Sequence, residues 1–124
     1  MTDPGAREDQ GRLQVAEDYF LPAGSGAKHL IFPGVEIRST ALERLMLCVV
    51  RLEPGSVVFE HSHPHEQMGI LLEGRLEFTV GGVTRLLGPG DMWRIPGGVV
   101  HRVRALDQPS LAIDVFHPIR EEYL

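Results

Sequence analysis

Cysteine is scarce in this chain of 124 residues, and the single one, Cys48, cannot form an internal disulfide bond. Cys48 lies within the apolar run "LMLCVV", which predicts a buried and unreactive thiol. No apolar run approaches the length that a membrane span requires, so we expect no membrane partner. The opening residues "MTDPGAREDQGR" lack the basic-then-apolar pattern of a secretion signal, and we therefore expect a cytoplasmic protein.

Positive charge is also scarce, because the chain has 12 Lys and Arg residues but 17 Asp and Glu residues, for a net charge of −5. Binding to nucleic acid requires a basic face, so we expect no nucleic-acid partner. A small anionic substrate remains compatible with this charge, because a single arginine or a metal ion can set the local field.

The sequence lacks any apolar pattern of period 3.6 that is long enough for a helix. Instead, short apolar or alternating runs are separated by turn sequences such as "EPG", "GPG" and "PGG". In "TVGGVT" two glycines predict a two-residue hairpin turn. The predicted strands are residues 29–32, 35–40, 44–52, 56–62, 68–74, 75–80, 83–87, 91–95, 99–106 and 110–116. This pattern predicts an all-β sandwich or barrel in one domain over residues 15–124, after a flexible tail over residues 1–14.

Histidine is concentrated in the stretch "HSHPHEQ", residues 61–67, which contains three of the six histidines. Strand alternation over residues 56–63 would place Val57, Phe59, His61 and His63 on one face. Much later, alternation in "VVHRVRA" places His101 on a face with Val103 and Ala105. Three neutral imidazoles and one side-chain oxygen make a suitable ligand set for a divalent transition metal. The alternative is that these histidines belong to a surface loop or form ordinary hydrogen bonds in the core.

Glycines and prolines decide between these two interpretations. The spacings Gly55-x5-His61-x-His63-x3-Gln67-x6-Gly74 and Gly90-x5-Pro96-x-Gly98-x2-His101 resemble the two sequence motifs of the cupin superfamily. The resemblance implies a jelly-roll barrel, also called a double-stranded β-helix, of six to eight strands with a metal inside near one mouth. Its metal ligands would be His61, His63, Gln67 and His101. The chain departs from the family pattern at Gln67, where glutamate is usual, and at Ala105, where asparagine is usual.

The glutamine changes the expected chemistry. An amide oxygen is neutral, so a divalent ion bound by three histidines and Gln67 keeps its full positive charge. That favours Lewis-acid catalysis over redox cycling with O₂. Glu66 is the alternative ligand, but it falls on the opposite face of the predicted strand, and His65 has the same wrong parity. The ligand set does not distinguish Mn, Fe, Co, Ni, Cu and Zn.

A second group of candidate residues lies in "LAIDVFHPIREEYL" at the C-terminus. Asp114 is the one charged residue of a strand that is apolar on both faces, and a buried carboxylate is costly unless it is paired or used. It is either a structural partner of Arg94, Arg102 or Arg104, or a general acid/base. Arg120 is suited to bind a carboxylate with two hydrogen bonds. Trp93 or its neighbour Met92 is expected to line the pocket.

These C-terminal residues also carry a narrower resemblance. Together with "HSHPHEQ", the pattern Asp114-x-Phe116-x-Pro118-x-Arg120 resembles the small cupins of pectin and alginate breakdown, which convert unsaturated uronate monosaccharides to their linear keto form. The resemblance implies that Asp114 transfers a proton, that Phe116 packs on the sugar and that Arg120 binds its carboxylate.

Three functions remain open from the sequence. The first is a metal-dependent isomerase or lyase acting on a small, uronate-like acid. The second is a metal-dependent dioxygenase, and the third is a cupin that binds a sugar or another small molecule without catalysis. In each case the partner is a small molecule. The family resemblance also implies a homodimer, in which strands within residues 29–40 are candidates for exchange.

Overall fold

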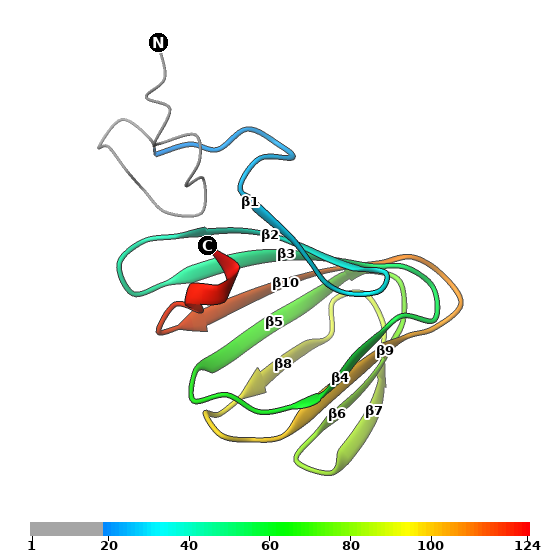
Figure 1. Cartoon of the computed structure of the whole chain (residues 1–124). Helices are drawn as coiled ribbons and strands as arrows, with labels where there is room; N and C mark the ends of the chain where they lie inside the picture. The colour runs from blue at the N-terminus through cyan, green and yellow to red at the C-terminus, as the bar shows by residue number, and fades with distance from the viewer. Residues whose placement is uncertain (1–18) are drawn as a thin grey trace.

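The computed structural model describes residues 19–124, so the predicted tail and the first residues of the predicted domain, up to residue 18, lie outside the described part. The described residues form ten strands and one 3₁₀ helix (Figure 1). Their bounds are β1 (Ala27–Phe32), β2 (Val35–Ala41), β3 (Met46–Leu52), β4 (Val57–His61), β5 (Glu66–Glu73), β6 (Leu76–Val80), β7 (Val83–Leu87), β8 (Met92–Ile95), β9 (His101–Ala105), β10 (Ser110–His117) and η1 (Glu121–Tyr123). Each predicted strand corresponds to one observed strand, with differences at the ends. Within residues 19–124, no helix has both the length and the apolar character that crossing a membrane requires.

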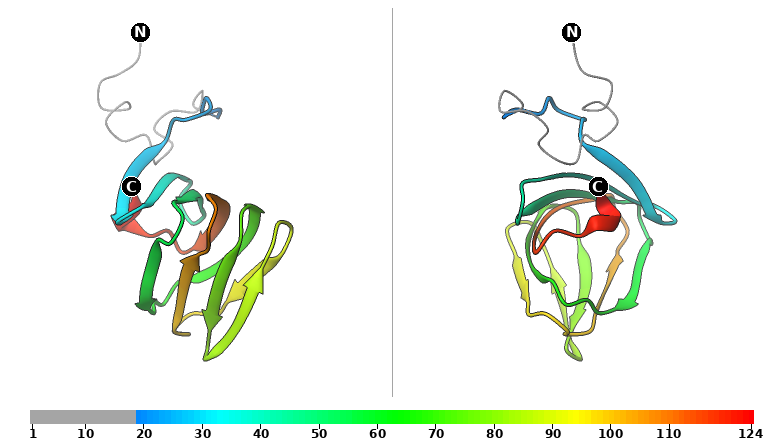
Figure 2. Two further views of the ribbon diagram at one scale, coloured as in Figure 1. Left: turned by 90° about the vertical axis from the view of Figure 1, so that its right-hand side faces the viewer. Right: turned by 60° about the vertical axis from the view of Figure 1, so that its left-hand side comes forward.

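The strands form two antiparallel sheets that face each other around a common interior (Figure 2). The larger sheet has the order β1-β2-β3-β10-β5-β8, and the smaller one has the order β4-β9-β6-β7. The predicted all-β, jelly-roll fold is confirmed. The ten strands exceed the six to eight implied by the family resemblance, because β1 and β2 extend the larger sheet beyond β3.

The core lies between the two sheets, and strand alternation explains which residues reach it. In β3 the side chains of Met46, Cys48, Val50 and Leu52 are buried, whereas Leu47 and Arg51 are exposed. The Cys48 thiol is buried, as the sequence predicted. Desolvation, with a smaller contribution from the negative charge of Asp114, raises its pKa to about 12. The thiol is therefore protonated at neutral pH and unreactive.

The predicted glycine hairpin joins β6 to β7. Val80 pairs with Val83, and the two residues between them, Gly81 and Gly82, have φ values of 55° and 80°. Both values are in the left-handed region that a two-residue turn of type I′ requires, and glycine occupies this region without steric cost.

The predicted face of β4 is wrong, because this strand contains a β-bulge. Val58 pairs with Val103 and His61 pairs with His101, so three steps along β4 correspond to two along β9. The extra residue breaks the alternation, and Val58 and His61 both line the interior. Phe59 points outward, with 59% of its surface exposed. His63 lies beyond the end of β4, in the loop to β5, rather than on the same strand as His61.

Candidate metal centre

Three histidines from separate parts of the fold meet inside one end of the barrel. His61 ends β4, His63 lies in the loop that follows, and His101 begins β9 as the register partner of His61. Their ligand atoms all lie within 4.8 Å of one another. The ring centroids of His61 and His101 are 4.3 Å apart. The bulge in β4 is what turns His61 inward at this position. Together the three histidines form a site that can bind a metal ion.

A backbone carbonyl fixes the tautomer of each ring. The Nδ1 atoms of His61 and His101 lie 2.8 and 2.9 Å from the carbonyl oxygens of Phe59 and Val99. Nδ1 of His63 lies 3.1 Å from the carbonyl oxygen of His65. Because a carbonyl oxygen only accepts hydrogen bonds, each Nδ1 carries the proton and donates it. Each Nε2 therefore keeps a lone pair for the centre, which is the arrangement that metal-binding histidines adopt.

The electrostatics of the site also suit a metal. Burial, with a smaller effect of the Arg120 charge, lowers the pKa of His63, and burial lowers the pKa of His101 to about 4. Both rings are therefore neutral at neutral pH, as metal binding requires. Nε2 of His101 is buried and has no hydrogen-bond partner among the described residues. An unsatisfied buried acceptor is costly, and a bound cation would remove that cost.

Gln67 lies beside the three histidines, and its two contacts account for an amide at this position. Its Nε2 donates to Oδ1 of Asp114 at 3.0 Å, which turns its Oε1 toward Nε2 of His63 at 3.1 Å. With the His63 proton on Nδ1, two lone pairs face each other across this contact, and a cation between them would satisfy both. A glutamate at this position would instead place a second carboxylate against Asp114. Glu66, the alternative ligand, is exposed.

The loop that carries His63 is fixed by the second motif. The Gly98 N–H donates to the His63 carbonyl at 2.8 Å. A Cβ atom on Gly97 would lie 2.4 Å from the Pro64 carbonyl oxygen, so only glycine allows this close approach. The "PGG" sequence therefore supports the metal centre as well as forming a turn. The sequence signal, two adjacent glycines, was visible, but the contact that requires them was not.

Asp114 lies inside the barrel next to this centre. Its Oδ1 accepts hydrogen bonds from Trp93 Nε1 at 2.7 Å and from Gln67 Nε2 at 3.0 Å. Desolvation raises its pKa to about 6, against the opposing effects of these two hydrogen bonds and of the Arg120 charge. The alternative that Asp114 pairs with Arg94, Arg102 or Arg104 is wrong. Arg102 and Arg104 lie 3.9 and 3.3 Å from Glu77, and Arg94 is exposed.

Gly69 makes the contact between Trp93 and Asp114 possible. It lies between them in the sheet, as the register partner of both. A Cβ atom there would lie 2.3 Å from Trp93 Nε1 and 2.5 Å from Asp114 Oδ1. In the sequence this glycine is only one residue of the predicted strand over residues 68–74, although a glycine inside a strand often marks a close approach.

We therefore expect Gly69→Ala to displace Trp93 or Asp114 and to lower the free energy of unfolding by about 1–3 kcal/mol, as overpacking of a core does. Urea unfolding followed by tryptophan fluorescence measures this difference. Gly88→Ala is the matched control, because the nearest atom to its added Cβ would be 3.9 Å away. The control should change stability by less than about 0.5 kcal/mol. Equal stabilities of the two variants would contradict the packing argument.

The candidate metal centre opens into a pocket between the two sheets. Its empty volume is about 560 Å³ with the opening to solvent included. The polar groups in its wall include His61, Gln67, His101, Asp114 and Arg120. Its aromatic residues are Phe78, Trp93, Phe116 and Tyr123, and the rest of the lining is mostly aliphatic. Of the two neighbours expected near the pocket, Trp93 lines it, whereas Met92 is 74% exposed.

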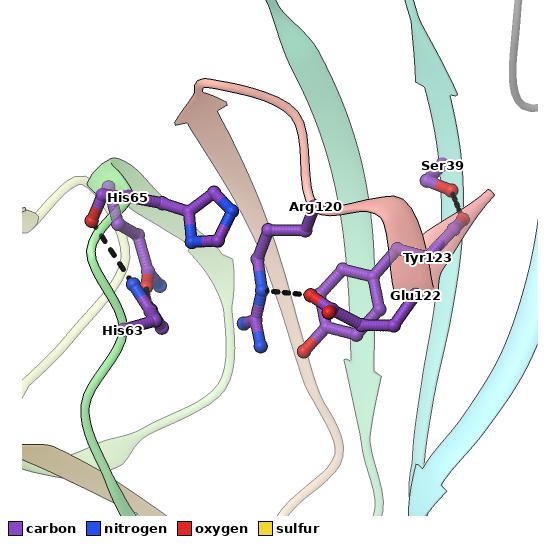
Figure 3. Close-up of polar contacts among 7 residues, drawn as sticks. Ser39, His63, His65, Arg120, Glu122 and Tyr123 are labelled. Atoms are coloured by element: carbon purple, nitrogen blue, oxygen red, sulfur yellow. Dashed lines mark hydrogen bonds and ion pairs between the residues drawn. The ribbon is translucent and has the colours of Figure 1, made fainter.

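The expected substrate residues from the C-terminus reach the same pocket. Phe116 is buried, and its ring centroid lies 5.8 Å from that of His63. The guanidinium carbon of Arg120 lies 5.3 Å from the centroid of Phe116. Figure 3 shows Arg120 with His65 on one side and with Glu122 and Tyr123 on the other. Nothing in the sequence marks Tyr123 and Glu122 as site residues, because no spacing links them to the metal motif.

Comparison with known proteins agrees with this architecture. The cupin domain family profile matches residues 48–116, which include all three histidines. The chain belongs to this family. It is 31% identical over 81 residues to the pectin degradation protein KdgF of Dickeya dadantii, covering 64% of this chain and 74% of that protein. It is 36% identical over 74 residues to the dimethylsulfoniopropionate lyase DddQ of Ruegeria pomeroyi, covering 59% of this chain and 37% of that protein.

Solved structures give the same result for this cupin. The structure of KdgF from Halomonas sp. superposes with a TM-score of 0.73 and 32% identity, covering 82% of this chain and all of that one (100%). An RmlC-like cupin from Shewanella frigidimarina superposes with a TM-score of 0.80 and 25% identity, covering 86% of this chain and 96% of that one.

Proposed function

We propose that this cupin is a metal-dependent enzyme that acts as an isomerase or lyase on a small, uronate-like acid. The observation that carries the proposal is the amide of Gln67, which connects Nε2 of His63 to the carboxylate of Asp114. The side chain of Gln67 thus contacts both a proposed metal ligand, His63, and a group able to transfer protons, Asp114. This arrangement suits Lewis-acid catalysis coupled to proton transfer, because a metal and a general acid/base must then act on neighbouring atoms of one substrate.

In this proposal His61, His63, Gln67 and His101 hold one divalent transition metal, which would polarise a hydroxyl or carbonyl oxygen of the substrate. Asp114 moves a proton at the neighbouring carbon or oxygen, and Trp93 fixes the carboxylate for that task through the bond to Oδ1. Phe116 packs on the ring of the substrate, and Arg120 binds its carboxylate group. The neutral amide of Gln67 leaves the positive charge of the metal available to the substrate.

The relatives support this choice of substrate and reaction class. One is named for pectin degradation, and pectin is a polymer of uronates. Another is named as a lyase. Neither name refers to oxygenase chemistry. Cytoplasmic localisation remains a prediction.

The decisive test combines elemental analysis with two activity assays on the purified protein. We expect stoichiometric divalent metal, turnover of an unsaturated uronate monosaccharide and no O₂ consumption at an oxygen electrode. Uptake of O₂ with enols or uronates would instead favour a dioxygenase. Saturable uronate binding without turnover would favour a non-catalytic binding protein.

We also propose that the protein is a homodimer that pairs through the outer face of the larger sheet. On this face the register places apolar side chains side by side across four strands, in one row of Val49, Ile113, Ile70 and Met92 and a second row of Leu47, Val115 and Met68. Several are well exposed, including Met68 and Met92. A contiguous apolar face of this kind marks an interaction site.

The charges at the edge of this face favour a second copy as the partner. Arg51 and Glu73 flank Leu111 in one row, and neither forms an ion pair with another described residue. A two-fold axis that runs parallel to β10, in the interface between the two facing sheets, brings Arg51 over the partner's Glu73. The same rotation brings Ile113 over the partner's Ile113. The face is therefore complementary to itself. Exchange of β1 is not part of this proposal, because β1 pairs with β2 of its own chain.

Replacing Ile113 with glutamate should separate the two subunits, because the variant places two like charges together at the centre of an apolar interface. Analytical ultracentrifugation is expected to show a dimer for the wild type and a monomer for Ile113→Glu. Val83→Glu, on the exposed edge strand β7 of the other sheet, is the control and should remain dimeric. A monomeric wild type would refute the proposal.

A further inference from the structure

The last five residues form a turn that is anchored beside the pocket. The backbone N–H of Tyr123 donates to the Arg120 carbonyl at 3.0 Å, and the Ser39 hydroxyl, from β2, donates to the Tyr123 carbonyl (Figure 3). Tyr123 and Leu124 are partly buried against the hydrophobic core. The turn is thus fixed to the larger sheet by its backbone and by its side chains.

This turn determines the orientation of Arg120. Nε of Arg120 donates to Oε1 of Glu122 at 2.7 Å. The guanidinium carbon lies 4.3 Å from the ring centroid of Tyr123 and 5.3 Å from that of Phe116. The Arg120 side chain is only 14% exposed, whereas that of Glu122 is 56% exposed. Glu122 therefore contacts the arginine from the solvent side, and the two rings restrict the plane of the guanidinium group.

The hydrogen bond to Glu122 leaves the end of the guanidinium group available. A guanidinium has five N–H donors in a planar fork, and the pair of terminal nitrogens matches the two oxygens of a carboxylate. Glu122 uses Nε, and neither Nη atom donates a hydrogen bond to another residue within the described part of the chain. Arg120 lines the pocket. The contact with Glu122 and the binding of a ligand carboxylate therefore use different atoms.

We infer that Glu122 is a positioning residue, which holds the guanidinium of Arg120 so that its two terminal nitrogens bind the carboxylate of the ligand in the pocket. This inference rests on the proposed function and adds a residue of the C-terminal turn to that site. The alternative is that Glu122 competes with the ligand carboxylate for Arg120. Removal of the Glu122 carboxylate weakens binding of the ligand if Glu122 is a positioning residue and strengthens it if Glu122 is a competitor.

The experiment measures binding of galacturonate and of galactose, its neutral counterpart, by isothermal titration calorimetry of the metal-loaded, full-length protein. Removal of the Glu122 carboxylate in Glu122→Ala should raise the Kd for galacturonate about three- to five-fold, the effect of losing a partly exposed ion pair. Glu122→Gln, which keeps the acceptor oxygen, should fall between that variant and the wild type. The Kd for galactose should not change in either variant. With an unsaturated uronate as substrate, KM should rise and kcat should stay the same.

Glu43→Ala, at an exposed carboxylate in the turn between β2 and β3, is the control and should bind galacturonate like the wild type. An unchanged Kd in Glu122→Ala, with the wild-type preference for galacturonate intact, overturns the inference and leaves the proposed function standing. Tighter binding of galacturonate by this variant also overturns it, since Glu122 would then be a competitor. A wild type that does not prefer galacturonate to galactose overturns both the inference and the proposed role of Arg120.

Discussion

Replacing His101 with alanine should abolish the metal binding that we propose for this cupin. The ring of His101 is buried, its Nε2 faces the centre without another partner among the described residues, and its tautomer is fixed by the Val99 carbonyl. Even the mutation of a residue that only orients a metal ligand lowers metal affinity about 10- to 100-fold. We expect the loss of a ligand to reduce affinity by at least about 100-fold and to abolish turnover. Metal content measured by plasma mass spectrometry after dialysis tests this directly.

The control for this experiment is His117→Ala, at an exposed histidine outside the group of three. It should keep the full metal content, which separates the effect of this site from the general affinity of histidine for metals. His101→Ala also leaves a cavity, so its fold must be verified by circular dichroism. A folded His101→Ala variant with undiminished metal content would show that the three histidines are not the metal site.

Replacing Asp114 with asparagine should reduce turnover about 100- to 10,000-fold, the usual contribution of general acid/base catalysis. The amide has nearly the same shape and retains an oxygen that can accept the hydrogen bonds from Trp93 and Gln67. The metal content and the fold should therefore be preserved while proton transfer is lost. Steady-state rates on an unsaturated uronate, together with metal analysis of the same sample, distinguish these effects.

Asp107→Asn, at an exposed carboxylate in the turn between β9 and β10, should retain full activity and serves as the control. Two results would contradict the role given to Asp114. Near-normal turnover in Asp114→Asn would exclude it as the proton-transfer group. Loss of metal in proportion to activity would mean that Asp114 acts only through Gln67, by holding the amide in place.

Local patterns in the sequence were enough to predict the fold and most of the candidate site. Turn residues and alternating runs mark the ten strands because both are properties of neighbouring residues. The spacings around His61, His63, Gln67 and His101 indicate a cupin because such a site requires fixed separations along the chain. The choice of Gln67 over Glu66 also followed from parity, since adjacent residues in a strand point to opposite faces.

Other features depend on how distant strands meet, and no local pattern contains them. The bulge in β4, which turns His61 inward and Phe59 outward, exists only relative to the register of β9. The hydrogen-bond partners of Asp114 are Gln67 in β5 and Trp93 in β8, rather than the arginines that were one of two alternatives from the sequence.

Short-range spacing therefore encodes the β-fold, the family and the residue types that can bind a metal. Contacts between distant segments establish which donors reach Asp114, why Gly69 must lack a side chain, and that Glu122 and Tyr123 contact Arg120 beside the pocket. Short-range spacing does not encode these contacts, because hydrogen bonds and close packing act over a few ångströms in space, whatever the separation of the residues along the chain.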